Sequence, residues 1–180
     1  MKNFVIIGTS CSGKTTTGKS ISEKLSIKLI DLDQYNWLPG WKMRPNEELR
    51  EIIKKEVKKP GWVVCGNYLR LQDITWPKAD VIIWLDYPLR ICLWRCLKRT
   101  IRGIITKEPT CNGNYETIRN TFFSTNSIFY WLFRSHFRIH RKHEVFKRLK
   151  QGDPIYKNIT LMRFKSQKET DAWFKNLIAE

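Results

Sequence analysis

The residues best suited to chemistry lie in the run from Gly8 to Thr15. It reads Gly-Thr-Ser-Cys-Ser-Gly-Lys-Thr and matches Gly-x4-Gly-Lys-Ser/Thr, the pattern of a phosphate-binding loop (P-loop). The two glycines let the backbone turn tightly, so that successive N–H groups point inward and form a nest for anionic oxygens. Lys14 adds a positive charge for the β- and γ-phosphates, and the Thr15 hydroxyl is a ligand for Mg²⁺. This pattern predicts a site for ATP and Mg²⁺.

The neighbours of the loop support this interpretation. The apolar run Phe4–Ile7 leads directly into it, and a helix-like segment near 14–25 follows. Strand, loop and helix in this order are the context in which the motif binds phosphate, and the positive end of the helix dipole points at the same anion. We therefore expect nucleotide contacts from Gly8, Ser10, Cys11, Ser12, Gly13, Lys14, Thr15 and Thr16.

Two carboxylates follow the next strand-like run, Lys28–Leu32. Asp31 and Asp33 are two residues apart, so both lie on one side of an extended chain. The carboxyl ends of strands face the crevice in which open α/β sheets bind ligands. The pair is therefore a candidate for catalysis or metal support, and the alternative is that one of the two caps or turns the chain.

The elements that must position these residues alternate between short strand-like runs and longer helix-like stretches. Most of the runs are continuous in Val, Ile and Leu, as expected of strands covered on both faces. This alternation predicts an α/β protein with three layers and a parallel sheet, and Gly103–Asn114 is the expected mobile loop. The expected strands are Phe4–Ile7, Lys28–Leu32, Trp62–Cys65, Val81–Leu85 and Ile159–Arg163; the expected helices lie near 14–25, 46–58, 88–103, 114–150 and 167–178.

Composition narrows the class of protein. The chain has 180 residues, 42% hydrophobic and 28% charged, which fits one soluble globular domain over residues 1–180. No apolar run approaches the roughly 20 residues of a membrane span. The five cysteines have neither a disulfide framework spacing nor a second pair to complete a zinc site. We expect a cytoplasmic protein with reduced thiols, monomeric or homodimeric, and without a membrane partner.

The net charge of +16 predicts attraction to polyanions without choosing among nucleotides, nucleic acids and anionic lipids. Much of it comes from residues 118–150, where an apolar stripe at helical spacing is expected to face the core. The basic face would clamp an anionic acceptor, touch nucleic acid or remain solvated. The stripe comprises Ile118, Phe122, Phe129, Phe133 and Phe137, and the basic face Arg134, Arg138, Arg141, Lys142, Lys147, Arg148 and Lys150.

Several motifs of the chain resemble the adenylate-kinase-like family of small P-loop kinases, and most closely its topology modulation protein (FlaR-like) group. The resemblance covers nearly the whole chain. It implies a nucleoside-monophosphate-kinase-like P-loop NTPase fold with a five-stranded parallel sheet. Besides the P-loop, the motifs are Asp31–Trp37, Pro39–Trp41, Gly61–Tyr68, Val81–Pro88 and Gly113–Arg119.

The resemblance implies a kinase that moves the γ-phosphate of ATP to a small acceptor such as a nucleotide or nucleoside. Lys14, Asp33 and Arg99 would be catalytic, with Asp33 as the acceptor-binding base. Asp31 would support Mg²⁺ through water, beside Thr15. Residues of a lid and basic helical region, at about 99–150, would close over the phosphates. Arg95 would stack on adenine.

The same resemblance assigns an acceptor site. Gly66 and Asn67 would form its loop, and Arg70 would hold an acceptor phosphate, one residue later than the simplest alignment. Bidentate guanidinium contacts suit phosphate. The remaining acceptor candidates are Trp37, Arg119 in the lid and Arg138 in the basic face. Trp37 and Trp41 would either stack on a nucleobase or serve as ordinary packing residues.

Cys65 departs from the family pattern, which commonly has an aspartate that supports Mg²⁺ at this position. A neutral thiol is a poor ligand for Mg²⁺. Either Asp31 or Asp33 takes over, or metal affinity and turnover fall. Two further interpretations therefore stay open: a nucleic-acid-associated P-loop ATPase or topology modulator, favoured by the net charge, and a catalytically weak nucleotide-binding regulator.

Overall fold

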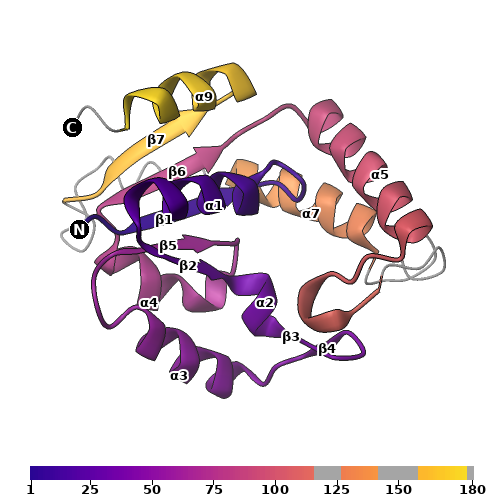
Figure 1. The fold of residues 1–180 in the computed structure, drawn as a ribbon, viewed down its shortest axis with the longest axis horizontal. Coiled ribbons are helices and arrows are strands. Elements are labelled where there is room, and N and C mark those ends of the chain that lie inside the picture. Colours follow the sequence, from indigo (N-terminus) through magenta and orange to yellow (C-terminus); the bar gives the residue numbers. More distant parts are fainter. Residues whose placement is uncertain (116–126, 142–157, 178–180) are drawn as a thin grey trace.

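A five-stranded parallel sheet forms the centre of the structure, a computed structural model that describes residues 1–115, 127–141 and 158–177 (Figure 1). The strands lie in the order β2-β5-β1-β6-β7, and all neighbours are parallel. This confirms the predicted α/β P-loop fold. The strands are β1 (Phe4–Gly8), β2 (Lys28–Asp31), β5 (Trp62–Cys65), β6 (Val81–Leu85) and β7 (Thr160–Phe164). Since β1 is the central strand, the P-loop opens at the middle of the sheet edge.

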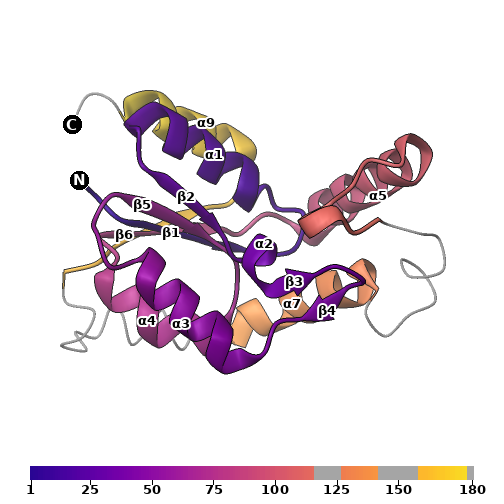
Figure 2. The ribbon, with the colours of Figure 1, turned by 60° about the horizontal axis from the view of Figure 1, so that its bottom comes forward.

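Helices cover both faces of the sheet (Figure 2). Helices α1 (Lys14–Leu25) and α9 (Gln167–Asn176) lie over one face, and α3 (Asn46–Glu56) and α4 (Gln72–Thr75) lie over the other. The alternation of side chains along β1 divides the core accordingly. Val5 and Ile7 belong to the apolar cluster on the α3 side, whereas Phe4 and Ile6 belong to the cluster on the α1 side.

Two longer helices carry the basic part of the chain, and their bounds differ from the prediction. Helix α5 (Leu89–Thr106) continues past Gly103, so the expected loop starts later. The helix predicted near 114–150 does not begin at residue 114, because Asn114 and Tyr115 are not helical. Helix α7 (Ile128–Arg141) lies within the predicted range. The Ser127 side chain accepts a hydrogen bond from the Phe129 N–H at the start of α7 (3.2 Å).

The predicted apolar stripe of α7 is wrong in part. Leu132 is fully buried, whereas Phe133 is 42% and Phe137 63% exposed. One residue turns an α-helix by about 100°, so a face centred on Leu132 leaves Phe133 to the side. Phe129 is partly buried against the core, and Ile118 and Phe122 lie outside the described residues.

Short elements that the hydrophobic pattern did not predict connect the strands near the site. Helix α2 (Leu32–Asn36) leads into an antiparallel hairpin of β3 (Trp37–Leu38) and β4 (Lys42–Met43). The hairpin turns at Gly40 and Trp41, both with left-handed backbones (φ 74° and 56°). Three 3₁₀ turns complete the described elements: η1 (Leu69–Leu71), η2 (Trp76–Lys78) and η3 (Cys111–Gly113). Among the described helices, none has the length and apolar character needed to cross a membrane.

Candidate active site

The P-loop runs from the end of β1 to the first turn of α1. Gly13 precedes α1 with φ 99°, a left-handed backbone that favours glycine and explains the second fixed glycine of the motif. The Lys14 ammonium donates to the carbonyl oxygens of Gly8 (3.1 Å) and Thr9 (3.0 Å). Its charge therefore lies across the loop, where the sequence predicts the phosphates.

Asp31 lies beside the Mg²⁺ candidate Thr15. The Thr15 hydroxyl donates to Oδ2 of Asp31 (3.0 Å), and the backbone N–H of Asp33 donates to its Oδ1 (3.2 Å). Burial raises the pKa of Asp31, the charge of Asp33 raises it further, and the bond from Thr15 opposes the shift. A hydroxyl and a carboxylate are the oxygen ligands that suit Mg²⁺, so these residues fit the ion.

Cys65 is placed for packing rather than for metal. It pairs in register with Asp31, is 1% exposed, and its thiol donates to the Lys14 carbonyl oxygen (3.4 Å). A Cβ built on Gly18 would lie 2.2 Å from the sulfur, so α1 packs directly on this thiol. Burial raises the pKa of Cys65 far above its ordinary value and keeps it neutral. Of the two replacements that the sequence leaves open, the geometry favours Asp31.

Asp33 belongs to a cluster that joins α2 to the loop after β5. The Tyr68 hydroxyl donates to Oδ1 of Asp33 (2.6 Å). Burial, then the Asp33 charge and this bond, raise the pKa of Tyr68, so the phenol stays protonated. The Arg70 guanidinium lies 5.7 Å from the Tyr68 ring centroid and donates to Oδ1 of Asn36. The predicted acceptor arginine and the predicted base therefore lie in one cluster.

The loop after β5 is also tied to the P-loop. Oδ1 of Asn67 accepts from the N–H of Gly8 (3.0 Å), and its amide group donates to the Gly8 carbonyl oxygen. The side chain predicted to contact the acceptor thus supports the start of the P-loop. Gly66 has φ 139°, and a Cβ there would lie 3.1 Å from that of Leu32, so only glycine fits.

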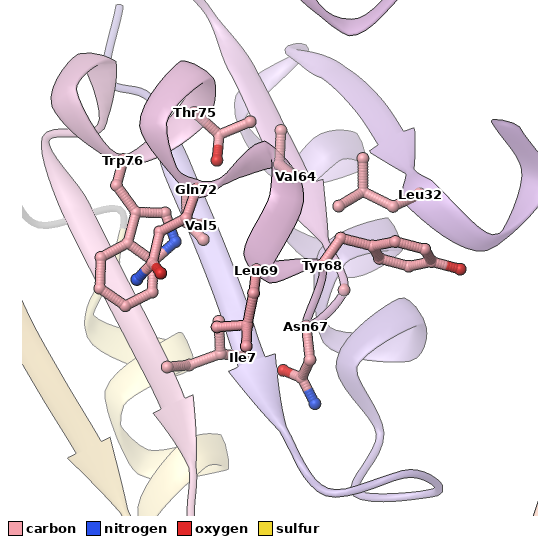
Figure 3. Close-up of a pocket in the computed structure, with 11 residues that line it drawn as sticks. Val5, Ile7, Leu32, Val64, Asn67, Tyr68, Leu69, Gln72, Thr75 and Trp76 are labelled. Carbon is pink, nitrogen blue, oxygen red and sulfur yellow. The ribbon is translucent and has the colours of Figure 1, made fainter. Parts of the chain in front are cut away.

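A hollow beside this loop is not part of the same cluster. It lies on the α4 side of β1 and β5, and its lining is mostly apolar, with Ile7, Leu69 and Trp76 among the residues (Figure 3). The Tyr68 hydroxyl points away from it, towards Asp33. Asp33, the predicted acceptor base, therefore lies away from this hollow, at the hydroxyl end of Tyr68.

The arginines of α5 differ in what they contact. Arg95 donates to the Ser12 carbonyl oxygen (3.2 Å) and to Gln167 (3.0 Å), and it lies over the Tyr87 ring (5.3 Å). It is therefore next to the P-loop, as predicted for an adenine contact. Burial raises the pKa of the Cys111 thiol and the charge of Arg99 opposes this rise, whereas Arg102 pairs with exposed Glu108 (3.3 Å).

The two hairpin tryptophans pack on one another. The Trp37 and Trp41 ring centroids are 5.6 Å apart with the planes at 77°, an edge-to-face contact. The Trp41 indole N–H also donates to the Tyr115 carbonyl oxygen (3.1 Å). This arrangement favours the packing interpretation over a platform for a nucleobase.

The side chains of two predicted site residues, Arg119 and Arg138, are not described by the structure. Arg119 is outside the described residues, and Arg138 lies in α7 with a side chain that is not described. Conversely, His136 of α7 lies with Nδ1 3.3 Å from the Thr9 hydroxyl of the P-loop. No pattern in the sequence indicates this P-loop contact. Asn114, discussed below, was likewise not predicted as a site residue.

Several known proteins similar to the chain are shikimate kinases. It is 29% identical over 145 residues to a shikimate kinase of Sulfurihydrogenibium sp. (strain YO3AOP1), covering 72% of this chain and 83% of that protein. It is 27% identical over 130 residues to the uncharacterized protein YqaC of Bacillus subtilis, covering 71% and 72%. The structure of shikimate kinase from Acinetobacter baumannii in complex with shikimate matches with a TM-score of 0.54 at 14% identity, covering 99% of this chain and 91% of that one. No protein-family model matches the chain.

These similarities fix the general activity. The chain is an ATP-dependent P-loop phosphotransferase with the adenylate-kinase-like fold, and its cofactors are ATP and Mg²⁺. Relatives with a named activity include shikimate kinases, whereas the narrower likeness to the FlaR-like group stays a prediction.

Proposed function

We propose that the chain transfers the γ-phosphate of ATP to a hydroxyl group of a small hydroxylated acid of the shikimate type. The observation that carries this is the cluster of Asp33, Tyr68 and Arg70 beside the P-loop. A carboxylate can accept the hydrogen of an acceptor hydroxyl, and a guanidinium can bind a carboxylate through two hydrogen bonds. The Sulfurihydrogenibium relative is a shikimate kinase by name, and the Acinetobacter baumannii structure holds shikimate.

The proposed roles follow from position. Lys14 binds the β- and γ-phosphates, and Thr15 with Asp31 holds Mg²⁺, which when bound neutralises charge on the phosphate oxygens. Asp33 accepts the proton as the acceptor oxygen bonds to the γ-phosphorus. The bond from that phosphorus to the β,γ-bridging oxygen breaks, and ADP leaves. Arg99 stabilises charge on the moving phosphoryl group.

Residues 1–180 would act as one P-loop kinase unit, with the lid at about 99–150. All five cysteines are free thiols, which fits the cytoplasmic location that the sequence predicts.

A second candidate function is that of a nucleic-acid-associated ATPase. The net charge of +16 and the exposed side of α7 favour it. There the Arg134 guanidinium lies 5.7 Å from the Tyr130 ring and 5.6 Å from the Trp131 ring. Aromatic and cationic groups together suit single-stranded nucleic acid. Such binding would weaken steeply with added salt, because phosphate contacts release counterions.

The decisive experiment measures acceptor-dependent ADP release. Shikimate, nucleosides, nucleoside monophosphates, sugars and a single-stranded oligonucleotide are compared at saturating ATP and Mg²⁺, with Lys14→Ala as the inactive reference. Lys19→Ala, an exposed lysine on the same helix, is the matched control. Turnover with shikimate above the Lys14→Ala background supports the proposal. Turnover with only a nucleoside, a nucleotide or the oligonucleotide would show that the acceptor is that compound and not shikimate. No turnover with any of the compounds would refute a kinase for small acceptors.

A further inference from the structure

The loop after α5 is fastened to the β3–β4 hairpin through the side chain of Asn114. Its Oδ1 accepts from the Trp41 N–H (2.8 Å), and its amide group donates to the carbonyl oxygens of Leu38 (3.0 Å) and Cys111 (2.7 Å). Asn114 is only 4% exposed. One buried side chain therefore uses its acceptor and one donor to join two segments more than 70 residues apart in the chain, and its second donor bonds within its own loop.

Asn112 makes a second set of contacts in the same direction. Its amide group donates to the carbonyl oxygens of Gln34 (2.7 Å) and Trp37 (2.5 Å), and its N–H donates to Oε1 of Gln34 (3.3 Å). Its backbone is left-handed (φ 52°), which asparagine tolerates better than most residues. Gln34 directly follows Asp33, so these bonds end beside the predicted base.

The bonded segments carry the two halves of the proposed site. Helix α5 bears Arg95 and Arg99 and ends in this loop, while the hairpin continues from α2, which bears Asp33. In Figure 1 the loop curls back from α5 to lie against β3, and η3 contacts both α2 and β3. Burial, then the charges of Asp33 and Asp31, raise the pKa of Cys111 to about 11, and Arg99 opposes the shift. The loop thus lies against α2, which carries Asp33, and directly follows the helix that carries Arg99.

We propose that Asn114 is a positioning residue, which bonds the loop after α5 to the hairpin so that Arg99 and Asp33 are held around a small acceptor. This rests on the proposed function. The bonds hold the loop against the segment that follows Asp33, an arrangement that favours a small acceptor over a polynucleotide end. They also limit the entry of water, which would otherwise accept the phosphoryl group.

The test uses the full chain with Asn114→Ala, and Asn46→Ala, an exposed asparagine at the start of α3, as the control. Hydrogen exchange of the backbone amides is measured without ligand. Asn114→Ala should speed exchange in residues 37–43, where the Trp41 N–H loses its acceptor, and leave α3 unchanged. Loss of one buried hydrogen-bond partner predicts a change of about tenfold.

Kinetics separate positioning from simple stability. With shikimate as acceptor, Asn114→Ala should raise KM for shikimate about tenfold and KM for ATP less than about twofold. ADP release without acceptor should rise relative to the acceptor-dependent rate. Trp41→Phe, which removes the indole bond to Tyr115 and shortens the ring that packs on Trp37 but keeps the Trp41 N–H bond to Asn114, should show a smaller change in the same direction.

The outcomes that overturn the inference differ from those that overturn the proposed function. Unchanged exchange in residues 37–43, or equal rises in both KM values, would refute a positioning role for Asn114. If the wild type does not use shikimate, the proposed acceptor fails, but exchange and acceptor-free ADP release still decide the role of Asn114. Unchanged values for both in Asn114→Ala would then refute it.

Discussion

The Thr15 hydroxyl donates a 3.0 Å hydrogen bond to Oδ2 of Asp31, and this bond joins the phosphate loop to a strand two places away in the sheet. It brings together two oxygen groups that Mg²⁺ prefers. Yet burial and the neighbouring Asp33 disfavour the ionised form of Asp31, which is the form that supports the metal. Function and stability therefore make opposite demands on one carboxyl group.

We predict that Asp31→Asn raises the midpoint of thermal unfolding at pH 7 without ATP or Mg²⁺. The fold raises the pKa of Asp31, so the contribution of this group to stability is full below its unfolded pKa, about 3.9, and is lost as pH rises through the folded value. The difference between variant and wild type should therefore shrink as pH falls towards 4. Asp171→Asn, on exposed α9, is the control; an equal rise there would remove Asp31 as the cause.

The same substitution should raise the Mg²⁺ concentration for half-maximal ADP release, because an amide binds Mg²⁺ more weakly than a carboxylate. Titration with Mg²⁺ at saturating ATP measures this. A half-saturating concentration equal to that of wild type would show that Asp31 does not support the metal.

Cys65→Asp tests whether the departure from the family pattern matters for metal binding. The sulfur lies against Gly18 and under α1, so a carboxylate there would be buried beside the carboxylate of Asp31. We expect a loss of about 3 kcal/mol or more in the free energy of unfolding, measured with urea, and no gain in Mg²⁺ affinity. Cys65→Ser, close in size, should cost less. A stable Cys65→Asp variant that needs less Mg²⁺ would contradict the packing role.

The phosphate loop and the five strands were predictable because each is a local pattern: two glycines with a lysine, or a short run rich in apolar residues. The cluster around Asp33 was predictable in part, because Arg70 and Asp33 follow strand ends that meet at one sheet edge. Asn114 was not predictable as a site residue. Its partners in the hairpin are backbone atoms of Trp41 and Leu38. Since every residue has a backbone, such contacts cannot be recognised from the residue types.

Helix α7 shows a different limit. Aromatic residues at helical spacing predict an apolar face, but spacing alone does not say which of two adjacent faces is covered. Leu132 packs into the core, so Phe133 and Phe137 remain exposed. The position of the helix on the sheet, which depends on residues far away in the chain, decides between the two faces.

Arg95→Lys should impair ATP binding selectively. The guanidinium bridges Ser12 and Gln167 and lies over the Tyr87 ring, and a lysine ammonium cannot keep this planar, forked set of contacts. We expect KM for ATP to rise about tenfold, with a smaller effect on the acceptor. Arg90→Lys, exposed on the same helix, is the matched control. Equal effects of the two variants would argue for a general charge effect instead.

Tyr68→Phe isolates one hydrogen bond at the proposed acceptor site. The phenol donates to Asp33 at 2.6 Å, whereas the ring contacts Arg70, so the substitution removes the bond and keeps the ring. Without this donor Asp33 is less well oriented, and acceptor-dependent turnover should fall about tenfold, with KM for ATP nearly unchanged. The free energy of unfolding should fall by only about 1 kcal/mol, since a single hydrogen bond contributes little net stability. Tyr130→Phe, which removes an exposed phenol on α7, should leave turnover at the wild-type level. If Tyr68→Phe instead turned over like wild type, Asp33 would not need this partner, and its role as the base would lose its main support.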